Sequence, residues 1–492
     1  MNTVQRIAKN TGVLLTSQAI SYILGFFFIM YSARYLGAKG FGVLSFALAF
    51  AGIFGVFVDL GLNIFMVREV ARNKSLASKY LGNIFIMKIT LSTIIFGLIV
   101  LTINLLPYPE QTVKVVYLIA LSVLFNALTS VFYSIFQAFE KMEYQSLGQV
   151  LNSVLMLTSV IFAINQNYTI IGFSYLYFFV SFIVLGFSFT ICMLKFVKPN
   201  IEIDWGLWKQ IIKSAYPIGI MAICNIIRFR ADTVMLSLMK NDSAVGLYNA
   251  AYKLLDASVV LPSIIMVSII PIMSQYYKNS LDSFNMFYER MFKYLFIIAL
   301  PIALIITLLA RPIINLVYGI NFEGSANALQ VLIWAVTSMY VSMLVGAVYI
   351  TADKQDISMK LTILSVILNI IFNLFLIPRY SYVGASAATV ISEFFGLFIG
   401  VFFLSKYGHK LNILNNCIIP LINIALAGIL AVFLINIGVN IFLTVIITIM
   451  LYGFVTYKII IKEDDKQLIK NTFNSLRIKK IKRDGYHELI KM

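Results

Sequence analysis

Long apolar runs separated by short polar segments dominate this chain. A membrane-spanning helix needs roughly 20 predominantly apolar residues, and about fourteen runs reach that length. Their predicted limits are 12–33, 41–65, 81–105, 113–137, 144–165, 169–194, 214–238, 245–274, 291–310, 327–351, 358–377, 381–404, 417–436 and 439–460. The pattern therefore predicts an all-α polytopic membrane protein with about fourteen transmembrane helices.

The composition supports a membrane protein and excludes an ordinary soluble one. Of the 492 residues, 60% are hydrophobic and 12% are charged, whereas soluble domains carry about 25% charged residues. The net charge is +17. The basic residues lie in short segments between apolar runs and form no patch on a soluble domain, so we expect no nucleic-acid partner.

The distribution of Lys and Arg predicts the orientation in the membrane. With the N-terminus inside, the inner segments carry 28 basic residues and the outer loops carry 6. This asymmetry follows the positive-inside rule. We therefore expect a protein of the cytoplasmic membrane with both termini in the cytoplasm, and a basic cytoplasmic tail at 461–492.

An internal repeat predicts the domain organisation. A shift of 204 residues places Gly42–Ala47 on Gly246–Ala251 and Lys9 on Lys213. Chance alignment of low-complexity apolar helices is the alternative. The repeat divides the spans into six-helix bundles at 1–205 and 206–412, with a final helix pair at 413–460. Because six is even, the two bundles would share one orientation, which is a recurrent transporter plan with the substrate path between the halves.

Ionisable residues inside the apolar runs are the main candidates for function. Each costs about 2.5–3.5 kcal/mol near the bilayer centre, so such residues usually pair or face water. The candidates are Asp59, Lys88, Arg228, Arg230, Asp232, Lys253, Asp256 and Glu393. Arg228 and Asp232 are four residues apart and are expected to pair. Arg230 points about 200° away from Arg228 and is predicted to be a cavity-lining cation.

The remaining charged candidates divide into three groups. Lys253 and Asp256 are three residues apart and are expected to pair. Asp59 and Lys88 lie within reach of helix ends and are expected to snorkel. Glu393 is a candidate proton or cation site. The alternative for all of these charges is an interhelical pair that only fixes packing.

Small and neutral polar residues in the runs predict helix contacts. Gly396 and Gly400 follow Glu393 on the same helix, and this spacing suggests close helix packing. The neutral polar residues in spans are expected to form helix–helix hydrogen bonds. They are Gln18, Tyr22, Asn63, Gln149, Asn152, Asn225, Asn249, Asn369 and Asn373.

No motif assembles an enzyme or a cofactor site. The chain lacks the phosphate-binding loop of ATPases and has no HExxH, CxxC or GxSxG motif. Its three cysteines lie in or beside apolar runs and its two histidines are far apart, so we expect no metal and no cofactor. The predicted activity is transport rather than catalysis, with a membrane glycan polymerase as the enzymatic alternative.

Three stretches together resemble a known family. They are Gly42–Ala47 with Val58–Arg72, Phe136–Tyr144, and Arg230–Leu236 followed by Val245–Lys253. All three are similar to Wzx-type oligosaccharide flippases, in the polysaccharide-export branch of the multidrug/oligosaccharidyl-lipid/polysaccharide superfamily. The resemblance covers most of the chain. It implies two six-helix bundles around a central cavity, plus a final helix pair.

The resemblance also implies a substrate, which is a polyprenyl-diphosphate-linked oligosaccharide carried from the cytoplasmic to the outer leaflet. Cationic side chains in a low-dielectric cavity attract a diphosphate strongly, so Arg230, Arg228 and Lys253 are predicted to bind it. Coupling or gating roles are predicted for Asp59, Asp232, Asp256 and Glu393. Predicted partners are membrane lipids, a glycan polymerase and glycosyltransferases. The alternatives are a lipid II flippase, a multidrug or cation antiporter, and a nontransporting scaffold.

Overall fold

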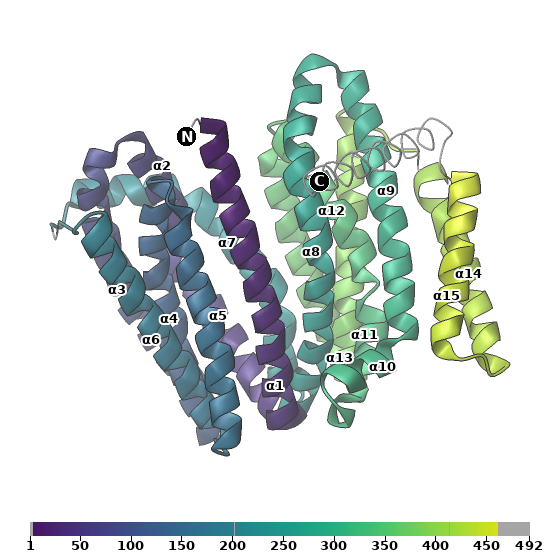
Figure 1. Cartoon of the computed structure of the whole chain (residues 1–492), viewed down its shortest axis with the longest axis horizontal. Helices are drawn as coiled ribbons and strands as arrows, with labels where there is room; N and C mark the ends of the chain where they lie inside the picture. Colours follow the sequence, from purple (N-terminus) through teal and green to yellow (C-terminus); the bar gives the residue numbers. More distant parts are fainter. Residues whose placement is uncertain (1–2, 201, 413, 461–492) are drawn as a thin grey trace, which may run out of the picture. The chain divides into compact units, whose positions relative to one another are not determined.

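The protein is built from α-helices throughout the part of the chain that the computed structural model describes, residues 3–200, 202–412 and 414–460. Figure 1 labels the helices in chain order. Their bounds are α1 Thr3–Asp59, α2 Leu62–Arg72, α3 Ala77–Leu105, α4 Glu110–Ala138, α5 Met142–Asn165, α6 Ile170–Lys195, α7 Trp205–Met239, α8 Asp242–Asn279, α9 Leu281–Leu308, α10 Ala310–Val317, α11 Gly324–Leu332, α12 Ala335–Thr351, α13 Gln355–Lys406, α14 Ile419–Asn436 and α15 Ile441–Val455. The prediction of an all-α membrane protein is confirmed. The predicted basic tail at 461–492 lies outside the described residues.

The predicted number of fourteen spans is not confirmed. The described residues contain 11 helices that are long and apolar enough to cross a membrane, or up to 12 if a bent pair within α7 is one span. Two of the long helices are broken: α1 at Gly37, with φ 64°, and α13 at Ser381, with φ 52°. Straight helices of their length would measure about 80 Å, against an apolar bilayer core of about 30 Å. Each broken helix holds two of the predicted runs, which accounts for the lower count.

The break in α13 folds this helix back on itself. The side-chain amide of Asn369 donates to Ser392 Oγ at 3.4 Å. A Cβ atom on Gly396 would lie 2.4 Å from Ser365 Oγ. In both pairs one residue precedes the break at Ser381 and the other follows it at about the same distance in sequence. The two halves of α13 therefore run antiparallel and in contact. The close helix packing predicted for Gly396 is therefore present, and its neighbour is the preceding half of the same helix.

Capping residues explain why some helices begin earlier than the apolar runs. The Asp204 carboxylate accepts from the Leu207 amide at 3.0 Å at the start of α7. Ser280 Oγ accepts from the Ser283 amide at 3.3 Å at the start of α9. Such caps satisfy amide groups that have no partner within the helix. The two helices therefore begin nine and ten residues before the predicted runs, in sequence that mixes polar and apolar residues.

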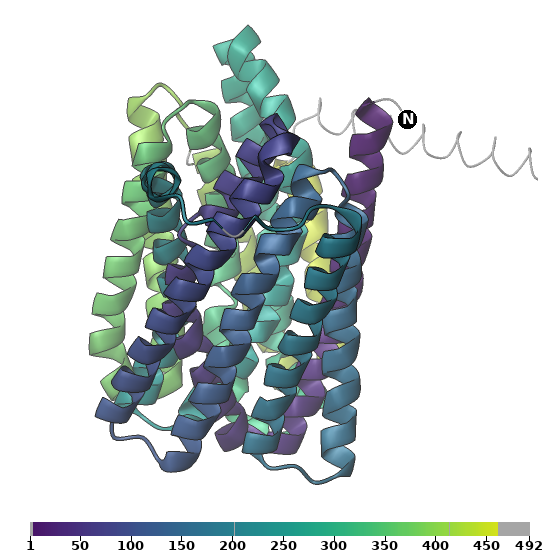
Figure 2. The same ribbon diagram turned by 90° about the vertical axis from the view of Figure 1, so that its left-hand side faces the viewer.

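The chain divides into two compact units. The first contains the described residues up to 257 together with 310–332 and 356–396, and the second contains 258–309, 333–355 and the described residues from 397. The predicted bundles, with boundaries at residues 205 and 412, stay a prediction. Within the first unit, α4 packs on α3 and α6, and α5 packs on α1 and α6. Figure 2 shows these helices running side by side.

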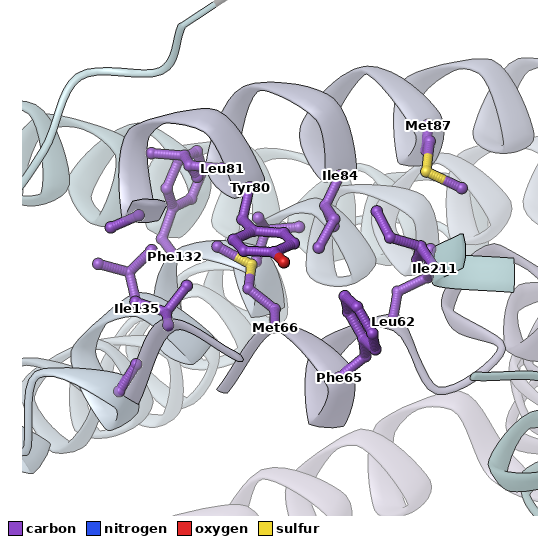
Figure 3. Packing of buried hydrophobic residues seen from close by; sticks show 14 of the residues in the cluster. Leu62, Phe65, Met66, Tyr80, Leu81, Ile84, Met87, Phe132, Ile135 and Ile211 are labelled. Carbon is purple, nitrogen blue, oxygen red and sulfur yellow. The ribbon is translucent and has the colours of Figure 1, made fainter. Parts of the chain in front are cut away.

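An apolar cluster holds α2, α3 and α4 together within the first unit. Figure 3 shows Leu62, Phe65 and Met66 of α2 facing Tyr80 and other apolar residues of α3. This packing follows an abrupt turn in the chain, since Gly61 adopts a left-handed conformation with φ 85° just before α2. The turn ends α1 at Asp59 and brings an ionisable residue to the edge of the cluster.

The second unit contains the predicted final helix pair, which corresponds to α14 and α15. Tyr452 on α15 donates its hydroxyl to the Ile297 carbonyl of α9 at 3.0 Å. Asn423 on α14 donates to the Tyr452 carbonyl at 3.2 Å and to Thr456 Oγ1 at 2.9 Å. These hydrogen bonds fix α15 against α9 and α14 within an otherwise apolar contact.

Candidate functional site

Three of the predicted charged residues lie close together along α7, but their partners differ from those expected. Arg228 does not pair with Asp232, as the spacing predicted. It forms an ion pair with Glu393 on α13, and Arg228 Nε lies 2.8 Å from Glu393 Oε1. Glu393 is only 5% exposed, so its carboxylate and the Arg228 guanidinium satisfy each other where water is scarce.

Asp232 instead lies at the centre of a buried network of neutral donors. Tyr248 of α8 donates to Asp232 Oδ2 at 2.5 Å, and Thr389 of α13 donates to the same oxygen at 2.6 Å. Asn373 donates to Oδ1 at 2.5 Å. Asp232 is 2% exposed. Three hydrogen bonds replace the hydration that its carboxylate loses on burial, which makes a cationic partner unnecessary.

The same network connects both halves of α13 with α7 and α8. Asn373 also donates to Asn369 Oδ1 at 3.1 Å, one helical turn away. Thr233 and Asn249 exchange hydrogen bonds at 3.3 Å and 3.2 Å. The predicted interhelical hydrogen bonds of Asn249, Asn369 and Asn373 are therefore confirmed. Tyr248 and Thr389 were missed by sequence reasoning because neutral hydroxyl groups in spans are common.

Arg230 faces a different environment from its two neighbours on α7. Within the described part of the chain it has no hydrogen bond or ion pair, and its side chain is half-buried. Its charge acts on Tyr177 of α6 and on Lys253 and Asp256 of α8. We call Arg230, Lys253 and Asp256 the Arg230 cluster. It contains two cations and one carboxylate, so its net charge is positive.

The predicted contact between Lys253 and Asp256 is present in this cluster. Lys253 Nζ lies 3.6 Å from Asp256 Oδ2, and their side chains are 31% and 45% exposed. Ion pairs this exposed are weak, at about 0.2–1 kcal/mol. Lys253 therefore remains a candidate ligand for an anion. Because Arg228 is neutralised by Glu393, Arg230 and Lys253 are the stronger candidates among the three predicted diphosphate ligands.

Asp59 and Lys88 form a separate site, and the expectation that both snorkel is wrong for Lys88. The Lys88 side chain is fully buried, and Nζ lies 2.6 Å from Asp59 Oδ1. Nζ also donates to Asn63 Oδ1 at 2.9 Å, and to Ser130 Oγ and the Ala127 carbonyl at 3.1 Å. Asp59 is 33% exposed. This cluster joins the end of α1 to α3 and α4.

Comparisons with known proteins identify the family. The model of the family described as "Polysaccharide biosynthesis protein" matches residues 7–277, which is more than half of the chain. The chain belongs to this family. The MatE family model matches residues 217–375. The resemblance stated from the sequence, to Wzx-like flippases of the wider superfamily, is confirmed.

Two relatives that match over most of their length carry names from glycan assembly. The chain is 20% identical over 413 residues to capsular polysaccharide biosynthesis protein CapF of Staphylococcus aureus, covering 81% of this chain and 100% of that protein. It is 20% identical over 439 residues to the probable low-salt glycan biosynthesis flippase Agl15 of Haloferax volcanii, covering 88% and 91%. Among solved structures, lipid II flippase MurJ in an inward closed conformation matches with TM-score 0.71 and 16% identity, covering 89% of this chain and 96% of that one. This likeness shows the fold.

Proposed function

We propose that this protein is a flippase for polyprenyl-diphosphate-linked oligosaccharides in surface polysaccharide biosynthesis. The family match and the names of the two relatives support this substrate class. The proposed reaction is translocation without covalent chemistry, in the cytoplasmic membrane, with both termini in the cytoplasm. Proposed partners are the membrane lipids, a glycan polymerase and glycosyltransferases.

One observation carries the proposal: Arg230 has no hydrogen bond or ion pair among the described residues and lies close enough to Lys253 for its charge to act there. A guanidinium within a spanning helix is unfavourable unless it meets water or an anion. A diphosphate offers several acceptor oxygens, and guanidinium groups bind such oxygens in bidentate geometry. We therefore assign the diphosphate to Arg230 and Lys253, with Arg228 as a further candidate. The polyprenyl chain would remain in the bilayer, where it loses no apolar contacts.

The acidic residues are proposed to control the conformational cycle. Asp232 and Glu393 connect α7 and α8 to both halves of α13, so any movement of α7 against α13 must break their bonds. Asp256 lies in the Arg230 cluster and Asp59 lies at the α1–α2 turn. Protonation of any of these carboxylates would weaken its contact, which is the proposed route for coupling or gating.

A reconstituted flipping assay tests the proposed function. Vesicles containing the purified protein receive a fluorescent polyprenyl-diphosphate oligosaccharide, and a membrane-impermeant quencher reports the fraction moved. We expect wild-type protein to flip this lipid and Arg230→Glu to be strongly impaired. Arg379→Glu is the matched control, because Arg379 is an exposed arginine outside the Arg230 cluster.

The same assay separates the alternatives. Transport of lipid II but not of the oligosaccharide lipid would identify a lipid II flippase. Uptake of a cationic dye without lipid movement would identify a multidrug exporter, and glycan elongation without lipid movement would identify a polymerase. Equal flipping by wild-type protein and Arg230→Glu would remove the Arg230 cluster as the diphosphate site.

A further inference from the structure

Two glycines related by the 204-residue repeat lie where α1 and α8 touch backbone to backbone. A Cβ atom on Gly42 would lie 1.7 Å from the carbonyl oxygen of Asp242. A Cβ atom on Gly246 would lie 1.9 Å from the carbonyl oxygen of Ala38. Ordinary contacts of a Cβ atom begin near 3.4 Å. Glycine is therefore required at both positions for this contact to close.

The contact obeys the repeat in both directions. The shift of 204 residues takes Ala38 to Asp242 and Gly42 to Gly246. Gly42 contacts Asp242 and Gly246 contacts Ala38, so the two contacts are related by the repeat. The backbone nitrogens show the same reciprocity. The Gly246 nitrogen lies 3.0 Å from the Gly42 Cβ position, and the Gly42 nitrogen lies 3.1 Å from the Gly246 Cβ position. The crossing therefore has local two-fold symmetry.

The crossing lies at the membrane face opposite the N-terminus. The first half of α1 runs from Thr3 to the break at Gly37 and is long and apolar enough to cross the membrane once, which would place the residues just after Gly37 on the far side. Another link joins residues that are far apart in the chain: the Tyr108 hydroxyl, between α3 and α4, forms a hydrogen bond with Ser237 Oγ near the end of α7 at 2.8 Å.

Arg34 adds a further contact near this crossing. It lies at the end of the first half of α1 and donates Nε to the Val317 carbonyl of α10 at 2.9 Å, and Nη2 to the Leu316 carbonyl. Both carbonyls are at the end of α10, where the helix dipole favours a cation. Like the glycine crossing, this contact involves backbone atoms, here the two carbonyl oxygens that accept from Arg34.

We propose that the Gly42–Gly246 crossing is the gate of the transport path on the face opposite the N-terminus, closed in this structure. The inference rests on the proposed function, because a transporter that alternates its access must close this face while the other is open. Backbone contact without intervening side chains brings two helices close enough to block a headgroup. The gate opens when α1 and α8 separate.

A methyl group at either glycine is the direct test. Gly42→Ala and Gly246→Ala each force the backbones apart and prevent closure. Gly52→Ala is the matched control, because Gly52 lies on the same part of α1 and has no atom within 4 Å of its Cβ position. All variants are purified in full length, and a sharp monodisperse elution shows that they fold.

Cysteine labelling reports the gate without any substrate. Ala250 is fully buried and lies one turn after Gly246 on the same helix face, so Ala250→Cys is the reporter. Cys192, Cys224 and Cys417 are first replaced by alanine. A membrane-impermeant maleimide added to the face opposite the N-terminus should label the Gly42→Ala and Gly246→Ala proteins about tenfold faster than the parent, because the closed population falls. The Gly52→Ala protein should label at the parental rate.

A reversible crosslink supplies the opposite constraint. Lys39 lies close enough to Asp242 for its charge to act on that carboxylate. In the Lys39→Cys and Asp242→Cys double variant, a short reducible thiol crosslinker should hold the gate closed. We expect flipping to stop and to return after reduction. Full flipping by the crosslinked protein would show that α1 and α8 need not separate, which overturns the gate.

The two readouts separate this inference from the proposed function. If the alanine variants label faster but wild-type protein moves no glycan lipid, the gate stands and the substrate assignment fails. If wild-type protein flips the lipid and the alanine variants label and flip at wild-type rates, the gate is wrong and the flippase stands.

Discussion

Arg228 on α7 and Glu393 on α13 form an ion pair although 165 residues separate them in the chain. The pair removes Arg228 as a free cation and links two helices that also share the Asp232 network. The two arginines on α7 therefore differ as candidate ligands, because Arg228 already has a carboxylate partner. Arg228 links α7 to α13, which leaves Arg230 as the arginine that we propose binds the anion.

The Arg228–Glu393 pair should contribute strongly to thermal stability. Removing one partner of a buried pair costs about 3–5 kcal/mol, because the remaining charge is left without a partner. Arg228 is 27% exposed, so we expect Glu393→Gln to cost the lower end of that range. Thermal unfolding in detergent measures the loss. Glu323→Gln, at an exposed glutamate, should leave the melting temperature unchanged.

The double variant Arg228→Gln/Glu393→Gln completes this test. If the two residues interact as described, it should be more stable than the sum of the single losses predicts. Additive losses would contradict a direct pair.

Lys88 should tolerate neutralisation poorly. The change Lys88→Met leaves the Asp59 carboxylate without its cation and leaves Asn63 Oδ1 without the Lys88 donor. We expect a loss of roughly 3 kcal/mol, measured by thermal unfolding. Lys114→Met is the control, since Lys114 pairs with Glu110 at 2.6 Å but both are exposed. That change should leave the melting temperature unchanged, because exposed ion pairs contribute little to stability. Equal losses in the two variants would show that burial of Lys88 is unimportant.

Opposite charge changes in the Arg230 cluster should have opposite effects on substrate affinity. Lys253→Gln removes a cation and should raise the KM for the glycan lipid by about two- to fivefold, while Asp256→Asn should lower it by a similar factor. Initial flipping rates at varied substrate density measure both. The exposed Asp282 provides the control Asp282→Asn. Changes of KM in the same direction would argue against an electrostatic role.

His409 should make the second unit less stable in mild acid. Burial lowers the pKa of His409 below its usual 6.5, and its ring packs 5.2 Å from Phe284 with Nδ1 2.6 Å from Asn285 Oδ1. Below pH 6.5 the unfolded chain binds a proton that the folded protein resists. The free energy of unfolding is therefore highest above pH 6.5. It decreases as the pH falls from 6.5 toward the lower pKa of His409 in the folded protein.

A glutamine substitution isolates this effect. We expect the melting temperature to fall between about pH 7.5 and 5.5 in the wild-type protein, and to fall less in His409→Gln. Identical pH profiles for the two proteins would exclude His409 as the source.

The sequence predicted the helical membrane fold because a long apolar run indicates a helix that can lie in lipid. It did not predict that two runs on either side of Gly37, and two on either side of Ser381, continue as one broken helix. Ser381 adopts φ 52° although it is not a glycine, so the residue type did not predict the break. The starts of α7 and α9, where polar residues interrupt the apolar pattern, were missed for a related reason: a continuous apolar run indicates the membrane core and not the capped end of a helix.

The candidate site was predicted only in part. Spacing along one helix correctly paired Lys253 with Asp256, since three residues make one turn. The same rule paired Arg228 with Asp232 and was wrong, because a carboxylate on α13 competes for the guanidinium. Contacts between residues far apart in the chain depend on how the helices pack. The spacing of residues along a single sequence does not predict that packing. Lys88 shows the same limit, since its four acceptors come from three helices.

The Gly42–Gly246 crossing has a further consequence. Because each side presents the surface that the other requires, the contact is isologous, like the interface of a two-fold symmetric dimer. A half-length chain would carry the complete surface and would match a second copy of itself. Both repeats must therefore keep a glycine at this position. A bulkier residue at either Gly42 or Gly246 prevents the close contact, and the glycine that remains does not restore it.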